Sequence, residues 1–600
     1  MFFSGGVIWG GGDRQAGNIF FTATGTVSLQ GSRVENNLNP GTTGNSNNIF
    51  EVIEAGDTSE FFGSIIIDAG AIELDGSQLS VSSFGQGNAG IVFMEANEST
   101  RISNSSGVFS DISSLGTGDA GGIFIGSPLI FLDQESIVSS RIFGASPSMA
   151  IGRVALEGDV INVSGGSIVS TSVFGQGSAG LVSLTATDEI IVQGEGSTVA
   201  SSLGEFAVGQ AGTVSISTND LEIRDQGSIS TTAFGQGDAG VVLIFATGDV
   251  LLENQGKIFA NGQSQATSGG GVLIVADRVI AKNRSGITSS NFTASPSRRS
   301  DNADATRLAE QSGGATLIGA RRIVLDDNSF ISAFSVSGEG GGIGLFTDEY
   351  VALSDNSYIT TSSFDTDDLS FRDGSGNFIG SGGDIDTRTD FLVGTPRRDN
   401  NIIATAIDGK GGVINVIALS LFDIAKRPEV VETNDVSAES RFGLNGVVTV
   451  NALNIDPSRS LDDLPDNRLP DLLAEGCRPN GRPIPKDKLY ITDQGGMRPR
   501  PDDILRGNNL QLANLEADAV ATADARETTG AGPGANAGAT ADGPATPALD
   551  KSPPVTSPPP PIAAQGWVRS ADGKVSFRAR IPNPSPIAAV PGYSSCGGNS

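Results

Sequence analysis

The residues of this sequence that are best suited to chemistry are carboxylates, because histidine is absent from all 600 residues. The lack of histidine excludes Ser–His–Asp and Cys–His catalytic sites and every zinc site built on imidazole. The densest group of acids lies in the stretch FDTDDLSFRDGSGNFIGSGGDIDTRTD, residues 364–390. Its carboxylates include Asp365, Asp367, Asp373, Asp384 and Asp386.

Carboxylates mixed with Gly and Asn are typical of calcium sites, since calcium takes six to eight oxygen ligands. This stretch contains neither a complete EF-hand loop nor a run of Gly-Gly-x-Gly-x-Asp nonapeptides. A solvated insertion is therefore the favoured interpretation, with a calcium site as the alternative. The sequence indicates no other cofactor.

Composition narrows the class of protein further. The chain carries 38 Lys and Arg against 68 Asp and Glu, a net charge of −30, which disfavours nucleic acid as a partner. It contains 81 Gly, while only 18% of its residues are charged and 6% aromatic, a mixture typical of many short strands joined by tight turns. No run of 18 apolar residues is present, so we expect no membrane span.

The tetrapeptide FGQG occurs three times, beginning at Phe84, Phe174 and Phe234. The intervals between the copies are 90 and 60 residues, both multiples of thirty. Such a period predicts a stack of similar structural units, in which each Phe contributes to a column and the glycines form an outward corner. A ligand-contacting ridge is the alternative interpretation of these corners, whose first two residues are Phe84, Gly85, Phe174, Gly175, Phe234 and Gly235.

A glycine opens each repeat, and the pattern after it is that of short strands. In the unit from Gly212 to Thr232, three short segments alternate apolar and polar residues with a period of two. One such coil cannot bury its apolar face alone, whereas stacked coils can. The sequence therefore predicts an all-β, right-handed parallel β-helix of about 30-residue coils. The successive markers are Gly90, Gly121, Gly152, Gly180, Gly212, Gly240 and Gly271, with weaker copies near Gly314, Gly342, Gly383, Gly412 and Gly446.

Catalysis is the main alternative function, because parallel β-helices also host polysaccharide lyases and hydrolases. Those enzymes need clustered carboxylates on one strand face of consecutive coils. Here the in-register positions hold Ser, Thr and small apolar residues, and the pair Asp326-Asp327 has no matching cluster one unit away. We therefore expect a non-catalytic protein, with a secreted carbohydrate-active enzyme as the alternative.

Four segments are expected along the chain. Residues 1–455 contain the repeats, 456–510 form a Pro-rich and locally basic segment, and 511–562 are a low-complexity linker rich in Ala, Gly and Pro. Residues 563–600 contain a predicted hairpin, with strands at Trp567–Arg569 and Lys574–Arg580.

These features resemble the filamentous-haemagglutinin-like exoproteins of cyanobacteria, the secreted (TpsA-type) partners of two-partner secretion. The resemblance rests on the SxFGQGxAGxVxxxA copies and on the tail, and it covers about residues 10–598. The tail matches the family's pattern at Cys477, at the run ITDQGGMRP (Ile491–Pro499), at Gln565-Gly566-Trp567 and at Cys596. Within the run, Asp-Gln replaces the Gly-Arg of the family's pattern.

The resemblance implies a secreted, surface-associated adhesin that mediates adhesion or aggregation. Its expected partners are an outer-membrane two-partner secretion transporter and an unknown surface ligand, a glycan among the candidates. It also implies a role for Cys477 and Cys596, either as a disulfide that helps to retain the protein at the cell surface or as two free thiols. Since no signal peptide or secretion domain is recognised, we expect this chain to be a carboxy-terminal portion.

Overall fold

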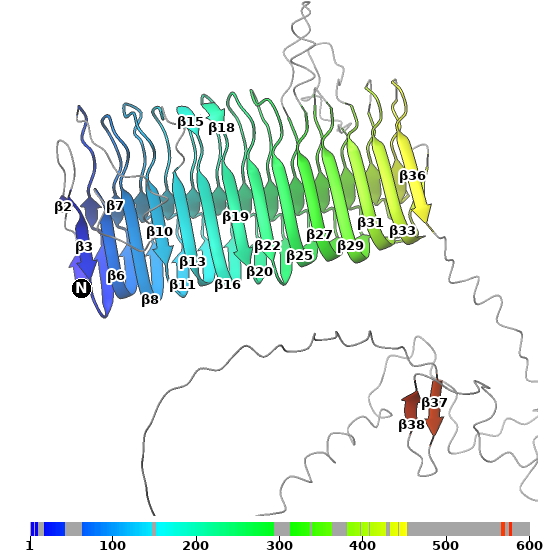
Figure 1. The fold of residues 1–600 in the computed structure, drawn as a ribbon, viewed down its shortest axis with the longest axis horizontal. Coiled ribbons are helices and arrows are strands. Elements are labelled where there is room, and N and C mark those ends of the chain that lie inside the picture. Colours follow the sequence, from blue (N-terminus) through cyan, green and yellow to red (C-terminus); the bar gives the residue numbers. More distant parts are fainter. Residues whose placement is uncertain are drawn as a thin grey trace, which may run out of the picture. The chain divides into compact units, whose positions relative to one another are not determined.

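The computed structural model describes most of the repeat region and one strand pair of the tail (Figure 1). The chain divides into two compact units, Met1–Pro470 and Asp471–Ser600. All structural statements below concern the described residues, which are 2–4, 7–9, 17–41, 63–146, 152–292, 312–336, 339–362, 381–396, 398–406, 409–427, 433–441, 443–452, 566–569 and 575–578.

The first unit is a parallel β-solenoid, as the sequence predicts. Each coil contributes strands to two sheets, and most strands pair in parallel with the equivalent strand of the next coil, usually about thirty residues later, so that the coils lie side by side along one axis (Figure 1). Connections between parallel strands are right-handed in nearly all proteins, and the right hand of this solenoid stays a prediction. Within the described residues we find no α-helix, and hence none that could span a membrane.

The larger sheet contains 19 strands among the described residues. Its strands are β1 Phe2–Ser4, β3 Ile19–Thr22, β4 Thr26–Gln30, β6 Ile65–Asp75, β8 Ile91–Ser103, β10 Gly122–Gly126, β11 Leu129–Leu132, β13 Arg153–Ser164, β16 Leu181–Gln193, β19 Thr213–Thr218, β20 Asp220–Arg224, β22 Val241–Ala246, β23 Asp249–Glu253, β25 Gly271–Ala281, β27 Ala315–Leu325, β29 Gly342–Leu353, β31 Asp384–Gly394, β33 Val413–Phe422 and β36 Val447–Ala452.

The second sheet of the solenoid contains 15 short strands among the described residues. They are β2 Val7–Trp9, β5 Arg33–Glu35, β7 Gln78–Ser80, β9 Gly107–Phe109, β12 Ile137–Ser139, β14 Ile168–Ser170, β17 Thr198–Ala200, β21 Ser228–Ser230, β24 Lys257–Phe259, β26 Gly286–Thr288, β28 Phe330–Ser332, β30 Tyr358–Thr360, β32 Asn401–Ile403, β34 Ala425–Lys426 and β35 Asp435–Ser437.

Two small pairs complete the strands. β15 Gln176–Ser178 and β18 Val208–Gln210 pair in parallel at the corner that carries FGQG. In the second unit, β37 Gly566–Arg569 and β38 Val575–Arg578 pair antiparallel, where the sequence predicts a hairpin.

The core lies between the two sheets and is built from columns of like residues. Val182, Val214 and Val242 occupy one position in successive coils, and all three are fully buried. Alternate residues of each strand point inward, which is why apolar and polar residues alternate in the sequence. One apolar cluster therefore runs through the coils from Phe21 to Ala438.

A column of glycines marks the place where each coil enters the larger sheet. The carbonyl oxygen of each of these glycines typically accepts a hydrogen bond from the next coil, where the donor is the backbone N–H of the residue that follows the column glycine. Gly270 accepts such a bond from Ala315 at 3.0 Å. A Cβ at most of these positions would overlap the backbone of the preceding coil, so only glycine fits. The column is Gly90, Gly121, Gly152, Gly180, Gly212, Gly240, Gly270, Gly314, Gly341, Gly383, Gly412 and Gly446.

The corner that leads from the larger sheet into the second sheet, as between β20 and β21, is a tight turn with two successive residues in the left-handed region. Asp225 and Gln226 have φ of 53° and 69°, and Asn254 and Gln255 have 51° and 66°. Asn254 Nδ2 donates a hydrogen bond of 3.0 Å to Asp225 Oδ1 in the coil below. Asn and Asp tolerate this conformation better than most residues, which explains their recurrence at this corner.

Candidate functional site

The most distinctive surface of the solenoid is a ridge of exposed apolar side chains at the FGQG corner. Six consecutive coils each contribute one residue to it. Leu115 and Phe206 are 86% and 85% exposed, and the other four are exposed to between 37% and 46%. We call this surface the corner ridge, and it consists of Phe84, Leu115, Phe143, Phe174, Phe206 and Phe234.

A second, smaller apolar core holds the corner ridge in place. Ile112, Ile142, Val173 and Leu203 stack through successive parallel bridges just before the ridge residues, and all four are buried. They pack with a column of alanines such as Ala179, which explains the recurring Ala-Gly pair in the sequence. The ridge is therefore presented by a packed corner.

Two ridge residues lie on longer corners. Leu203 and the Ala211 of the same coil are eight positions apart, whereas Val173 and Ala179 are six apart. The two extra residues include Phe206, which explains its exposure, and the Leu115 corner is extended in the same way. Sequence reasoning missed both residues because neither coil contains FGQG, although each coil has an apolar residue at the corner.

The FGQG glycines have two different roles. Gly177 and Gly237, the second glycines of their copies, have φ of 146° and 153°, a conformation that favours glycine. At Gly175 and Gly235, the first glycines, a Cβ would overlap carbonyl oxygens of the preceding coil. Gly85 lies at the equivalent position of the first copy.

The Phe residues of the three FGQG copies are too far apart along the axis to stack on one another. Phe174 instead stacks on Phe143 of the coil before it, with ring centroids 5.0 Å apart and planes inclined by 11°. Gly204 follows in the next coil and Ser113 lies between Phe84 and Phe143. The stacked pair presents ring edges to solvent, because the stacking direction runs along the solenoid axis.

A partly buried ion pair lies at the Phe143 end of the ridge. Arg141 Nη2 donates to Asp111 Oδ2 at 3.0 Å, and the Arg141 backbone N–H donates to Oδ1 at 2.7 Å. Burial raises the pKa of Asp111 above its ordinary value, and Arg141 opposes that shift. The Arg141 guanidinium also lies 5.1 Å from the Phe143 ring centroid and 5.6 Å from that of Phe109, so it contacts both rings.

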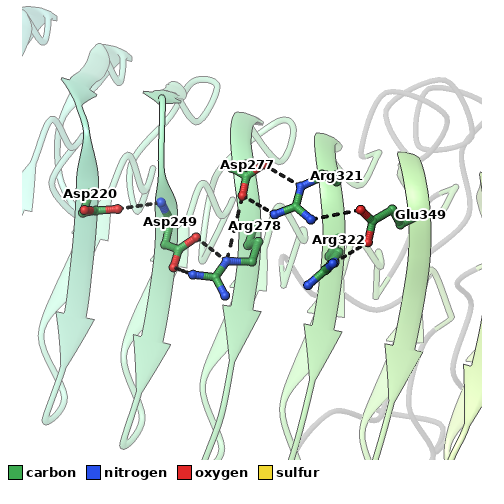
Figure 2. Close-up of polar contacts among 7 residues, drawn as sticks. All are labelled: Asp220, Asp249, Asp277, Arg278, Arg321, Arg322 and Glu349. Atoms are coloured by element: carbon green, nitrogen blue, oxygen red, sulfur yellow. Dashed lines mark hydrogen bonds and ion pairs between the residues drawn. The ribbon is translucent and has the colours of Figure 1, made fainter. Parts of the chain in front are cut away.

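A ladder of charged residues crosses the outer face of the larger sheet (Figure 2). Arg278 pairs with Asp249, and its Nε also lies 4.0 Å from Asp277. We call this ladder the charged rail, and it consists of Asp220, Asp249, Asp277, Arg278, Arg321, Arg322 and Glu349.

Two arginines of one strand share the acids of the two neighbouring strands. Arg321 Nε and Nη2 donate to Asp277 at 2.8 and 2.7 Å, and its Nη1 donates to Glu349 at 2.9 Å, while Arg322 also pairs with Glu349. Hydrogen bonds from Arg321 hold the pKa of Asp277 below its usual range, and Arg322 and Arg321 do the same for Glu349. The arginines are partly exposed, so each pair contributes little to stability.

An open groove of about 720 Å³ runs beside the glycine column of the later coils. Its floor is backbone, because two neighbouring columns there are glycine, as at Gly313 and Gly314. Glu339, Asp384 and Lys410 lie on its sides. Glycine recurs here because the preceding coil leaves no room for a Cβ in one column and the next coil leaves none in the other, so the packing of the coils explains the groove.

The expected calcium ligands are only partly within the described residues. Asp384 lies on the side of the groove, and Asp386 Oδ1 accepts a hydrogen bond of 3.0 Å from Asn415 Nδ2. Asp365, Asp367 and Asp373 lie outside the described residues, as do Cys477 and Cys596. The part of the chain that the structure describes contains no group of three acids or thiols placed to hold a metal ion.

Comparison with known proteins yields the following. No family model matches the sequence, and no curated protein matches it either. Among solved structures, the HMW1 secretion domain from Haemophilus influenzae is similar, at 15% sequence identity and a TM-score of 0.27. The match covers 71% of this chain and 95% of that chain. At this identity and score the likeness carries no argument about function.

Proposed function

We propose that this chain is a secreted, surface-associated structural protein that mediates adhesion or aggregation without catalysis. The observation that supports it is the corner ridge, on which six consecutive coils each expose an apolar side chain. Exposed apolar patches on soluble proteins mark interaction surfaces. A stack of coils presents one apolar side chain per step of about 4.8 Å, which suits attachment to an extended surface.

The geometry of the ridge favours an apolar ligand surface over the flat face of a sugar ring. Sugars stack on aromatic faces, whereas Phe143 and Phe174 turn their faces toward each other and their edges outward. Leu115 and Phe206 extend furthest and would make the first contact. Export through an outer-membrane two-partner secretion transporter belongs to the same proposal, on the resemblance of the repeats and tail.

The ridge proposal is tested with the double variant Leu115→Asp/Phe206→Asp. We expect the variant to bind beads coated with alkyl chains at least about tenfold more weakly than the unmodified chain, because two apolar contacts become charges. Binding is measured by retention of fluorescent protein on alkyl-coated, alginate-coated and cellulose-coated beads. The matched control is Thr185→Asp/Ser217→Asp on the outer sheet face, which also adds two charges and leaves the ridge intact.

Equal binding of the ridge variant and the unmodified chain to every bead type would contradict the proposal. Loss of binding to polysaccharide beads alone would identify a glycan as the ligand and contradict the assignment of an apolar surface.

The non-catalytic part of the proposal has a separate test. Asp326 and Asp327, the acid pair singled out in the sequence, lie at a corner, where Asp326 Oδ1 accepts a hydrogen bond of 2.5 Å from Ser354 Oγ. A carboxylate held in a structural turn is poorly placed for general acid or base catalysis. We therefore expect no new reducing ends and no unsaturated products when the chain is incubated with pectin, alginate or cellulose; turnover of any of these would overturn this part.

A further inference from the structure

A second apolar surface lies on the outer face of the larger sheet, away from the corner ridge. Four adjacent strands, β22, β25, β27 and β29, expose apolar side chains there. Polar rows bound it on both sides, with Ser215 and Ser217 on β19 and Asp386 and Arg388 on β31. We call this surface the sheet patch, and its exposed members are Val241, Phe245, Val275, Leu317 and Phe346, with Leu243 and Leu273 half-buried between them.

Two exposed valines and two glycines of the sheet patch lie in matching columns. Val241 and Val275 are 39% and 45% exposed on β22 and β25. Gly342 and Gly319, on β29 and β27, occupy the same two columns, and a Cβ added at either glycine would meet nothing within 4 Å. Each of these two columns therefore holds an exposed valine on one strand and an open glycine position on another.

This arrangement is complementary to itself. If a second copy lies face to face with its coils in the opposite order, β22 of one copy faces β29 of the other, and β25 faces β27. Val275 then meets the open position at Gly319 of the second copy, and Val241 meets Gly342. Leu273 faces Leu317 and Phe245 faces Phe346, so each contact occurs twice around one two-fold axis.

The charged rail allows two acidic chains to approach at this face. The whole chain carries a net charge of −30, and such a charge opposes association. Beside the patch, however, three arginines of the charged rail form ion pairs with Asp249 on β23, Asp277 on β25 and Glu349 on β29. In the face-to-face arrangement the Asp277 of each copy lies toward the strand of the second copy that carries Arg321.

We propose that the sheet patch is a site of self-association, in which two copies of this chain pack face to face and antiparallel. Four strands at about 4.8 Å spacing make a small contact compared with the ~800 Å² per partner of a standard interface. The association is therefore weak for one pair and gains strength where many chains are displayed together. This surface is separate from the corner ridge, so the two proposals can fail independently.

The test is sedimentation velocity of the purified full chain over about 1–200 µM. We expect a concentration-dependent dimer with a Kd of about 10–100 µM, in line with a small interface. Val275→Asp and Gly319→Arg are each expected to weaken the dimer at least tenfold. Circular dichroism should show unchanged folding, because both positions face solvent.

The double variant Val275→Asp/Gly319→Arg is expected to restore the dimer, because each introduced carboxylate then faces the introduced guanidinium of the second copy. Phe206→Asp, on the corner ridge, should leave self-association unchanged. A chain that stays monomeric at all concentrations, a dimer that tolerates Val275→Asp, or a double variant that remains monomeric would each overturn the proposal.

Discussion

Substituting Gly314 with alanine is expected to lower the free energy of unfolding by about 3 kcal/mol, a large effect for the smallest possible side chain. The reason is the stacking of coils: a Cβ at Gly314 would overlap the carbonyl oxygen of Gly270 and approach that of Ser289. The Gly270 carbonyl accepts the hydrogen bond of Ala315, so it cannot move without breaking the ladder. The change is measured as the shift of the denaturant midpoint followed by circular dichroism.

The matched control is Gly319→Ala on β27, the strand that begins directly after Gly314. Gly319 faces open space, and alanine is favoured over glycine within a strand, so this variant is expected to be as stable as the unmodified chain or slightly more stable. Equal midpoints for the two variants would contradict close contact between successive coils at the glycine column.

Leu252→Ala is expected to destabilise the chain by about 2–5 kcal/mol, because the substitution leaves a cavity inside the stack. Leu252 is fully buried on β23 and lies between Ile223 of the preceding coil and Ala281 of the following one. Repeat proteins respond to such damage locally, so hydrogen exchange should increase most in the adjacent coils. Denaturant midpoints and amide exchange measure both effects.

Leu115→Ala is the control for Leu252→Ala, because it removes the same side-chain atoms at an exposed position. Leu115 is 86% exposed on the corner ridge, so its truncation is expected to change stability by less than about 0.5 kcal/mol. A cost for Leu252→Ala no larger than that for Leu115→Ala would mean that the coils do not enclose a common core.

The stacking of coils could be predicted because the sequence repeats the residues that stacking constrains most. The glycine markers Gly180, Gly212 and Gly240 lie in one column, and the alternation around them gives the inward-facing positions such as Val214. In two later coils the marker was one residue off: the column contains Gly270 and Gly341 rather than Gly271 and Gly342. Runs of consecutive glycines there leave the sequence without a unique choice.

The joining of strands was less predictable. Three short strands per coil are present where β19, β20 and β21 follow one another, yet in the coil before them β16 runs without interruption from Leu181 to Gln193. Whether the bend in the middle of the coil's longest segment divides it into two strands depends on local backbone geometry. The apolar pattern does not record this, because Ala186 and Ile190 remain buried through the bend.

The candidate surfaces depend on contacts between coils that sequence spacing hides. Arg278 and Arg322 occupy one column but are 44 residues apart, because residues 293–311 intervene between their strands, so the thirty-residue period does not align them. The same intervening residues separate Val275 from Gly319. Half of the corner ridge could be predicted from the sequence, because FGQG marks Phe84, Phe174 and Phe234 but does not occur in the coils between them.

Distances between spin labels along one outward column test the parallel stack most directly. Glu95, Ser217 and Arg388 share that column, and each is exposed. Pairs of labelled cysteines at these positions, in a Cys477→Ser/Cys596→Ser background, are measured by double electron–electron resonance. Stacked coils predict about 19 Å from 95 to 217 and about 43 Å from 95 to 388, at about 4.8 Å per coil. Distances that fail to increase with the number of intervening coils would contradict the solenoid.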